Sequence, residues 1–70
     1  MSTWPSTKAI RVLRALQRLG WAEQHRAGSH RILVREGWAN FIWAFHEHDE
    51  IGPRMLARIA KLTGLKPDDL

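Results

Sequence analysis

One segment of this chain combines residue types that phosphodiester chemistry uses. Gly28-Ser29-His30 places a histidine directly after a small-residue turn, at the start of a short aliphatic run. Arg26 and Arg31 stand on either side of it. Histidine gives and takes a proton near neutral pH, and arginine binds phosphate through two parallel hydrogen bonds. The spacing therefore indicates an acid–base residue beside groups that bind phosphate.

A second segment, His46-Glu47-His48-Asp49, has the composition of a metal site. Two histidines separated by one residue can bind zinc, but a tetrahedral site needs further ligands. His25 and Asp49 are the side chains that would supply them, and neither stands at a diagnostic spacing. The chain has no cysteine, which excludes a disulfide and a cysteine-based zinc site. We therefore interpret residues 46–51 as a solvated polar loop, and we expect neither a metal site nor a cofactor.

The charge of the chain is basic, because eleven lysines and arginines stand against seven acidic residues. A net charge of +4 favours polyanionic partners such as RNA, or an acidic protein. Six of the cations fall on two helical stripes, Arg11, Arg14 and Arg18 in one and Arg54, Arg58 and Lys61 in the other. Such stripes either follow a phosphate backbone, forming a cradle for RNA, or are the solvated faces of two helices.

The hydrophobic pattern predicts a single domain over residues 1–70 with the element order α-β-β-β-α. Ser6 is a good N-cap and Gly20 a good C-terminal residue for the first helix. Gly52-Pro53 opens the second helix and Gly64 ends it, and its expected apolar face consists of Met55, Leu56, Ile59 and Leu62. The three strands between the helices are expected at Trp21–Arg26, His30–Arg35 and Trp38–Phe45.

The last of these strands is apolar on both faces. One face carries Phe41, Trp43 and Phe45, and the other carries Trp38, Ile42 and Ala44. We expect an α+β fold in which two helices cover one face of a three-stranded antiparallel sheet, so that one of the two sets stays exposed. That set would mediate self-association or bind a partner protein. The bulk of the core would come from the six large aromatic residues, Trp4, Trp21, Trp38, Phe41, Trp43 and Phe45.

Several of these features occur in the same order in a known family. They are Leu19-Gly20-Trp21 at the end of the first helix, Gly28-Ser29-His30 before a strand, His46 after the third strand, a glycine–proline pair before the last helix, and Leu62-Thr63-Gly64-Leu65. Over residues 7–70 this set resembles the HicA-type mRNA interferase toxins, also called the YcfA-like family. The resemblance implies a double-stranded-RNA-binding-like fold, ribonuclease activity against mRNA, and a HicB-type antitoxin that covers the active face.

The resemblance also implies that His30 is the essential residue of the ribonuclease. A metal-independent ribonuclease needs a base that activates the 2′-hydroxyl and an acid that protonates the leaving oxygen. His30 can fill either role, and His46 is the second candidate. Arg26 and Arg31 would neutralise charge that develops on the phosphate, and Ser29 would donate a hydrogen bond to it. Alternatively, the arginines only pair across the strands and the serine only completes a turn.

Two other functions fit the same sequence. One is an RNA-binding module of the same fold without catalysis, and the other is an interaction domain whose Phe41, Trp43 and Phe45 face docks a protein. Residues 1–5 contain no basic region leading into an apolar stretch, so we expect no secretory signal. The longest apolar run, Phe41–Phe45, is far too short to span a membrane. We therefore expect a cytoplasmic protein.

Overall fold

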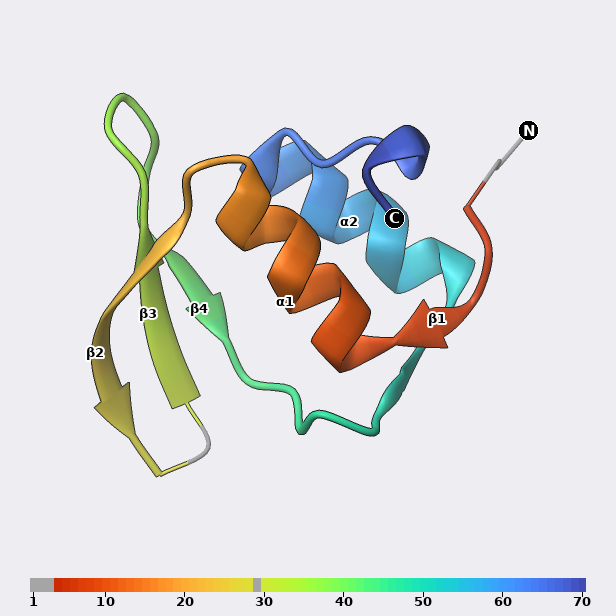
Figure 1. Cartoon of the computed structure of the whole chain (residues 1–70), viewed down its shortest axis with the longest axis horizontal. Coiled ribbons are helices and arrows are strands. Elements are labelled where there is room, and N and C mark those ends of the chain that lie inside the picture. The colour runs from red at the N-terminus through yellow and green to blue at the C-terminus, as the bar shows by residue number, and fades with distance from the viewer. Residues whose placement is uncertain (1–3, 29) are drawn as a thin grey trace.

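The computed structural model describes residues 4–28 and 30–70 of the chain. Its elements, in chain order, are β1 (Thr7–Lys8), α1 (Ala9–Arg18), β2 (Ala22–Ala27), β3 (His30–Val34), β4 (Phe41–Trp43), β5 (Glu50–Ile51), α2 (Pro53–Thr63) and the 3-10 helix η1 (Pro67–Asp69). Figure 1 shows α1 and α2 side by side, with the β2–β3–β4 sheet standing next to them. The arrangement confirms the predicted α+β fold, with two helices beside a three-stranded antiparallel sheet.

Both helices are amphipathic, and their apolar faces meet in the core. The buried residues are Ala9, Val12, Leu13, Ala15 and Leu16 from α1, and Leu56, Ile59 and Thr63 from α2. Pro53 occupies the first turn of α2, as predicted. The helix ends at Gly64, whose φ of +78° is left-handed and whose N–H donates to the carbonyl oxygen of Ala60 at 2.9 Å.

The register of the antiparallel sheet determines which side chains share a face. Leu33 and Trp43 are buried, so the face that carries them is turned to the helices. Ile32 pairs with Ile42 on the opposite face, where Ile42 is 61% exposed. The prediction that one apolar set of the last strand stays exposed is therefore confirmed, and the exposed set is the one that contains Ile42.

The other apolar set of this strand belongs to the core. Trp43 is buried, and Phe41 and Phe45 are half-buried against the core cluster. The rings of Trp43 and Phe45 meet edge to face, with their centroids 5.0 Å apart. The hypothesis that this face as a whole docks a protein is therefore wrong, because the helices already cover it.

Two tryptophans hold one end of the sheet to the helices. The indole N–H of Trp21 donates to the buried carbonyl oxygen of Thr63 at 3.2 Å. Trp38 meets Trp21 edge to face at 6.0 Å, and the guanidinium group of Arg35 stacks on the Trp38 ring at 5.2 Å. A Cβ atom built at Gly64 would lie only 2.8 Å from the Trp38 ring, so the two residues are in close contact. Trp38 is 41% exposed, and it covers the core instead of filling it as predicted.

The start of α1 differs from the prediction. Ser6 is not the N-cap, because α1 begins after Lys8 and has no side-chain cap hydrogen bond. Residues 7–8 form β1, which pairs with β5. The N–H groups of Ala9 and Ile10 donate to backbone carbonyls of the loop before β5, at 2.8 and 3.1 Å. These carbonyls satisfy N–H groups that the first turn of a helix leaves free, and they replace the expected serine cap.

The third strand and the polar loop also differ from the prediction. Strand β4 covers Phe41–Trp43 only, shorter than the expected Trp38–Phe45. The N–H of Trp38 donates to the carbonyl oxygen of Arg35 at 3.0 Å, so a turn occupies the start of the expected strand. Residues 50–51, expected in the loop, form β5 because β1 is available as a pairing partner.

Candidate nucleic-acid interface

His30 is the first residue of β3, so it lies at the end of the sheet where the hairpin connects β2 to β3. Strand β2 ends at Ala27, so the two strands are joined by a connection of two residues, Gly28 and Ser29. Gly28 has a φ of +61°, a left-handed conformation typical of such short hairpins. Ser29 lies outside the described residues, so its contact with phosphate stays a prediction. His30 is exposed, and within the described part of the chain its imidazole forms no hydrogen bond or ion pair.

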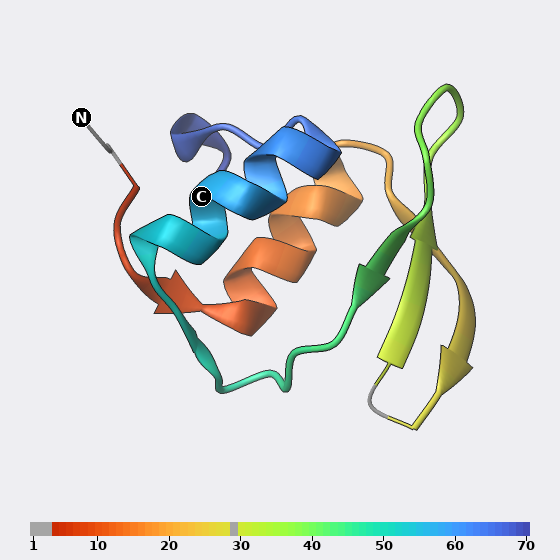
Figure 2. The same ribbon diagram turned by 180° about the vertical axis from the view of Figure 1, so that it is seen from behind.

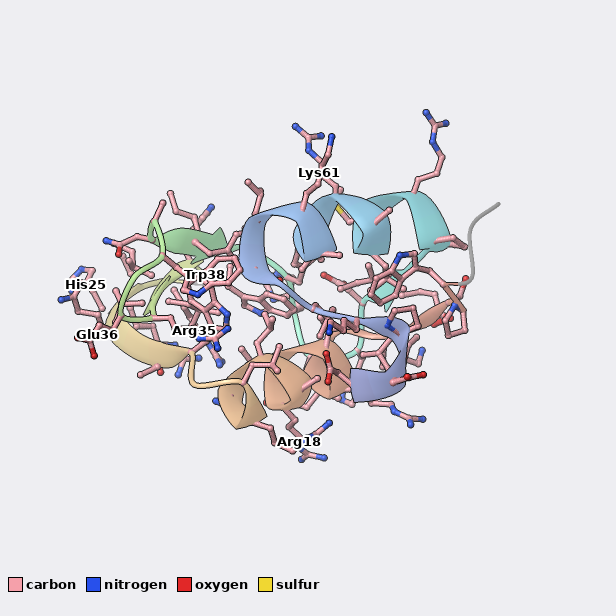
Figure 3. The ribbon with its side chains drawn as sticks, turned by 90° about the horizontal axis from the view of Figure 1, so that it is seen from above. Arg18, His25, Arg35, Glu36, Trp38 and Lys61 are labelled. Carbon is pink, nitrogen blue, oxygen red and sulfur yellow. The ribbon has the colours of Figure 1, made fainter. Side chains whose placement is uncertain are left out.

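His25 shares a face of the sheet with His30, which the sequence analysis did not predict. Ala27 pairs with His30, and His25 pairs with Ile32. Paired residues point to one face, and every second residue of a strand returns to it. His25 is therefore the diagonal cross-strand neighbour of His30, at about 7–8 Å in antiparallel geometry. Figure 3 shows that His25 points away from the helices. Counting back along β2 from the two-residue connection would have found it.

Arg26 and Arg31 lie on the other face of the sheet from His30. They are cross-strand partners of each other, and Arg31 also pairs with the buried Trp43. Nε of Arg31 lies 3.6 Å from Oε1 of Glu23, and its side chain is only 19% exposed. Strand alternation thus turns both arginines to the helix side, although both are close to His30 in sequence. A phosphate beside the His30 imidazole would meet Arg26 only around the edge of β2.

The arginine stripe of α1 borders a hollow. Arg11, Arg14 and Arg18 are all exposed and, with Leu70, they line a space of about 200 Å³. Nη2 of Arg18 donates to the carbonyl oxygen of Asp69 at 2.6 Å, which fixes one wall. None of the three arginines forms an ion pair with a carboxylate among the residues that the structure describes. Three unneutralised guanidinium groups around one hollow form a surface suited to anions.

The two basic stripes do not form one cradle. Figure 3 shows Arg18 of α1 and Lys61 of α2 on opposite sides of the molecule, pointing away from each other. Both helices turn their apolar faces to the same core, so their polar faces must point outward in different directions. The two stripes therefore do not face one common surface, and the binding of RNA by either stripe stays a prediction.

Strand pairing does not place His46 next to His30. Extending the β3–β4 register by one residue would place Ala44 opposite His30, but β4 ends at Trp43. The chain then leaves the hairpin and runs toward β5 (Figure 1). The backbone N–H of His46 donates to Oδ2 of Asp49 at 2.8 Å. Within residues 4–28 and 30–70, no group of three or more histidine or acidic side chains is placed to hold a metal ion.

A second hollow, which the sequence analysis missed, lies between β4 and α2. This apolar groove has a volume of about 190 Å³ and is lined by Phe41, Ile42, Ala44, Phe45, Met55, Arg58, Ile59 and Leu62. Figure 2 shows β4 and α2 on the same side of the molecule. Met55 and Leu62, expected in the core, are 39% and 55% exposed because they stand at the groove. The sequence contained a signal for this groove, because the apolar stripe of α2 is wider than the part of the helix that packs in the core.

These features describe a small basic α+β domain with an exposed histidine at the free end of its sheet. The chain belongs to the HicA toxin family, because the family described as HicA toxin of bacterial toxin-antitoxin matches residues 11–65. Searches of curated proteins and of solved structures each found no significant match. Membership of this family makes the chain the toxin of a toxin–antitoxin pair and implies an antitoxin partner. Across the described residues, no helix has the length and apolar character needed to cross a membrane.

Proposed function

We propose that this toxin is a ribonuclease that cleaves mRNA without a metal ion, with His30 as an acid–base residue. The observation that supports this most directly is the position of His30. Its imidazole is exposed at the first residue of β3, on the sheet face that the helices leave open, in a chain of the HicA toxin family. A substrate reaches this position without displacing any packed side chain.

The proposed reaction needs two proton transfers. A base removes the proton of the 2′-hydroxyl, whose oxygen then attacks the adjacent phosphorus, and an acid protonates the 5′-oxygen as its bond to phosphorus breaks. The products are a 2′,3′-cyclic phosphate and a free 5′-hydroxyl. We assign one transfer to His30 and the other to His25, because the register places both on one face as diagonal neighbours. Their separation leaves room for a phosphodiester between the two rings.

The arginines of α1 are proposed to hold the RNA backbone. Strand β2 and α1 lie on the same side of the molecule, whereas β4 and α2 lie on the other (Figures 1 and 2). A strand of RNA that passes the hairpin end can therefore follow β2 past Arg26 to the hollow bordered by Arg11, Arg14 and Arg18. Arg31, held by Glu23, would contribute positive potential more than direct contact.

Cleavage of a defined mRNA by the purified chain tests this proposal. We expect His30→Ala to lower the cleavage rate by about 10²–10⁴-fold, the usual contribution of a positioned acid or base. The fold should persist, because the His30 side chain is exposed, and circular dichroism checks this. His48→Ala is the matched control, since His48 is an exposed histidine of the loop before β5, and it should cleave at the wild-type rate.

Equal cleavage by wild type and His30→Ala would show that the catalytic assignment is wrong. Binding of the mRNA without cleavage by either protein would favour the alternative, an RNA-binding module without catalysis.

A further inference from the structure

The apolar groove between β4 and α2 takes no part in the proposed cleavage. Its lining is apolar apart from Arg58. Three of the lining side chains are strongly exposed, Ile42 by 61%, Leu62 by 55% and Met55 by 39%. A contiguous exposed patch of large aliphatic side chains is typical of a protein-binding surface. The groove therefore suits a ligand that contributes apolar side chains.

The helix that forms one side of this groove carries only basic charges, and one of them, Arg58, lines the groove itself. Arg54, Arg58 and Lys61 are exposed on α2, which contains no acidic residue. Strand β4 has no charged residue at all. The ion pairs within the described part of the chain are Lys8–Glu50 and Arg31–Glu23, so the three cations of α2 are left without an acidic partner there. Charge complementarity therefore selects an acidic ligand.

The groove also leads toward His30. Ala44 lines the groove, and it directly follows Trp43, the last residue of β4, which pairs with Arg31 next to His30. The Ile32–Ile42 pair lies on the same open face of the sheet as His30. A chain segment seated between Ile42 and Leu62 that continues across β3 would therefore cover the imidazole.

We infer that this groove is the docking site of an acidic segment of the antitoxin, which fills it with apolar side chains and pairs its carboxylates with Arg54, Arg58 and Lys61. Inhibition by covering His30 rests on the proposed function, but docking in the groove does not. A second copy of this chain fits less well, since it would bring the same basic rim against itself. RNA also fits less well, because bases stack on aromatic faces, and the exposed lining here is aliphatic.

The test uses the full chain and, as probe, the protein encoded by the gene adjacent to the toxin gene. Its affinity for the wild-type chain and for variants is measured by titration calorimetry. Leu62→Glu and Ile42→Glu should each weaken binding by about a hundredfold, as expected for a central interface residue. Arg58→Gln should weaken it by about tenfold. Gln17→Glu is the matched control, because it lowers the net charge by the same one unit at an exposed position of α1, away from the groove, and it should change the affinity less than twofold.

A second readout separates this inference from the proposed function. Leu62 lies outside the proposed catalytic residues, so Leu62→Glu should still cleave mRNA while escaping inhibition by the probe. If Leu62→Glu binds the probe more weakly but the wild-type chain does not cleave RNA, the docking site is supported and the proposed function is overturned. The docking site is overturned if the probe does not bind the wild type, or if it binds Leu62→Glu with unchanged affinity. It is also overturned if Leu62→Glu loses binding to oligouridine, because the groove would then bind RNA. The same holds if the wild type is a dimer that the variant dissociates, because the groove would then bind a second copy.

Discussion

Two sides of this molecule carry the same pattern of charge in different surroundings. On one side, α1 presents Arg11, Arg14 and Arg18 around a polar hollow, next to the exposed strand β2. On the other side, α2 presents Arg54, Arg58 and Lys61 along an apolar groove, next to β4. Figures 1 and 2 show the two helices and their neighbouring strands from these opposite sides.

The difference shows that a stripe of cations does not by itself define a ligand. Guanidinium groups around a hollow that three arginines line suit a phosphate backbone, whose binding is largely electrostatic. The same groups around Ile42, Met55 and Leu62 suit a protein segment that buries apolar surface as well as charge. Strand β3 lies between β2 and β4, and it carries His30. The two ligands would therefore meet at the candidate catalytic residue.

The largest effect is expected at His25, which lies on β2 beside His30. His25→Ala should lower mRNA cleavage by about a hundredfold, because it removes one of two proton-transfer groups. A pH–rate profile that is bell-shaped for the wild type should lose one of its limbs in the variant. A uniform fall in rate with both limbs retained would show that His25 only positions the substrate.

The two basic stripes can be compared directly by neutralising each in turn. The triple change of Arg11, Arg14 and Arg18 to glutamine should reduce the slope of log affinity against log salt by about 2–3, since each phosphate contact contributes roughly 0.7–0.9. The matched triple change of Arg54, Arg58 and Lys61 removes the same charge from the other side and should change the slope much less. Equal changes in both variants would show that both stripes contact RNA to the same extent, contrary to this expectation.

A smaller effect concerns the contact that holds the sheet to α2. Gly64→Ala should lower the free energy of unfolding by about 2–3 kcal/mol, because the new methyl group meets the Trp38 ring at a left-handed φ of +78°. Gly37→Ala is the control: its φ is +85°, but a Cβ atom there meets nothing, so we expect about 1–2 kcal/mol. Urea unfolding followed by tryptophan fluorescence measures both. Equal losses would show that the Trp38 contact adds no stability.

The smallest expected effect is that of a chelator. The described residues include no group of three or more potential metal ligands, and the proposed mechanism uses only side-chain proton transfers. Cleavage should therefore proceed at the same rate in EDTA as in buffer. A loss of activity in EDTA that one added divalent metal restores would contradict the mechanism and direct attention to His46 and His48.

Much of the fold could be predicted because it depends on neighbours in the sequence. The apolar period of α1 and α2, Pro53 in the first helical turn and the left-handed Gly64 after the last one are local features, and the structure confirms them. Alternation along β4 also showed that one of its two apolar sets must be exposed, as Ile42 is. The position of His30 at the start of a strand was predicted on the same local grounds.

The order of the two helices and the three-stranded sheet, the amphipathic character of the helices and the histidine beside a tight turn could be predicted from the chain alone, because they follow from backbone conformation and periodicity over a few residues. Only the tertiary structure decided which of these elements meet. The pairing of β1 with β5 replaced the Ser6 cap with distant backbone carbonyls. The β2–β3 register brought His25 to the face of His30 and turned Arg26 and Arg31 to the other. Packing of both helices on one core sent the basic stripes in opposite directions, a long-range result that no local pattern contains.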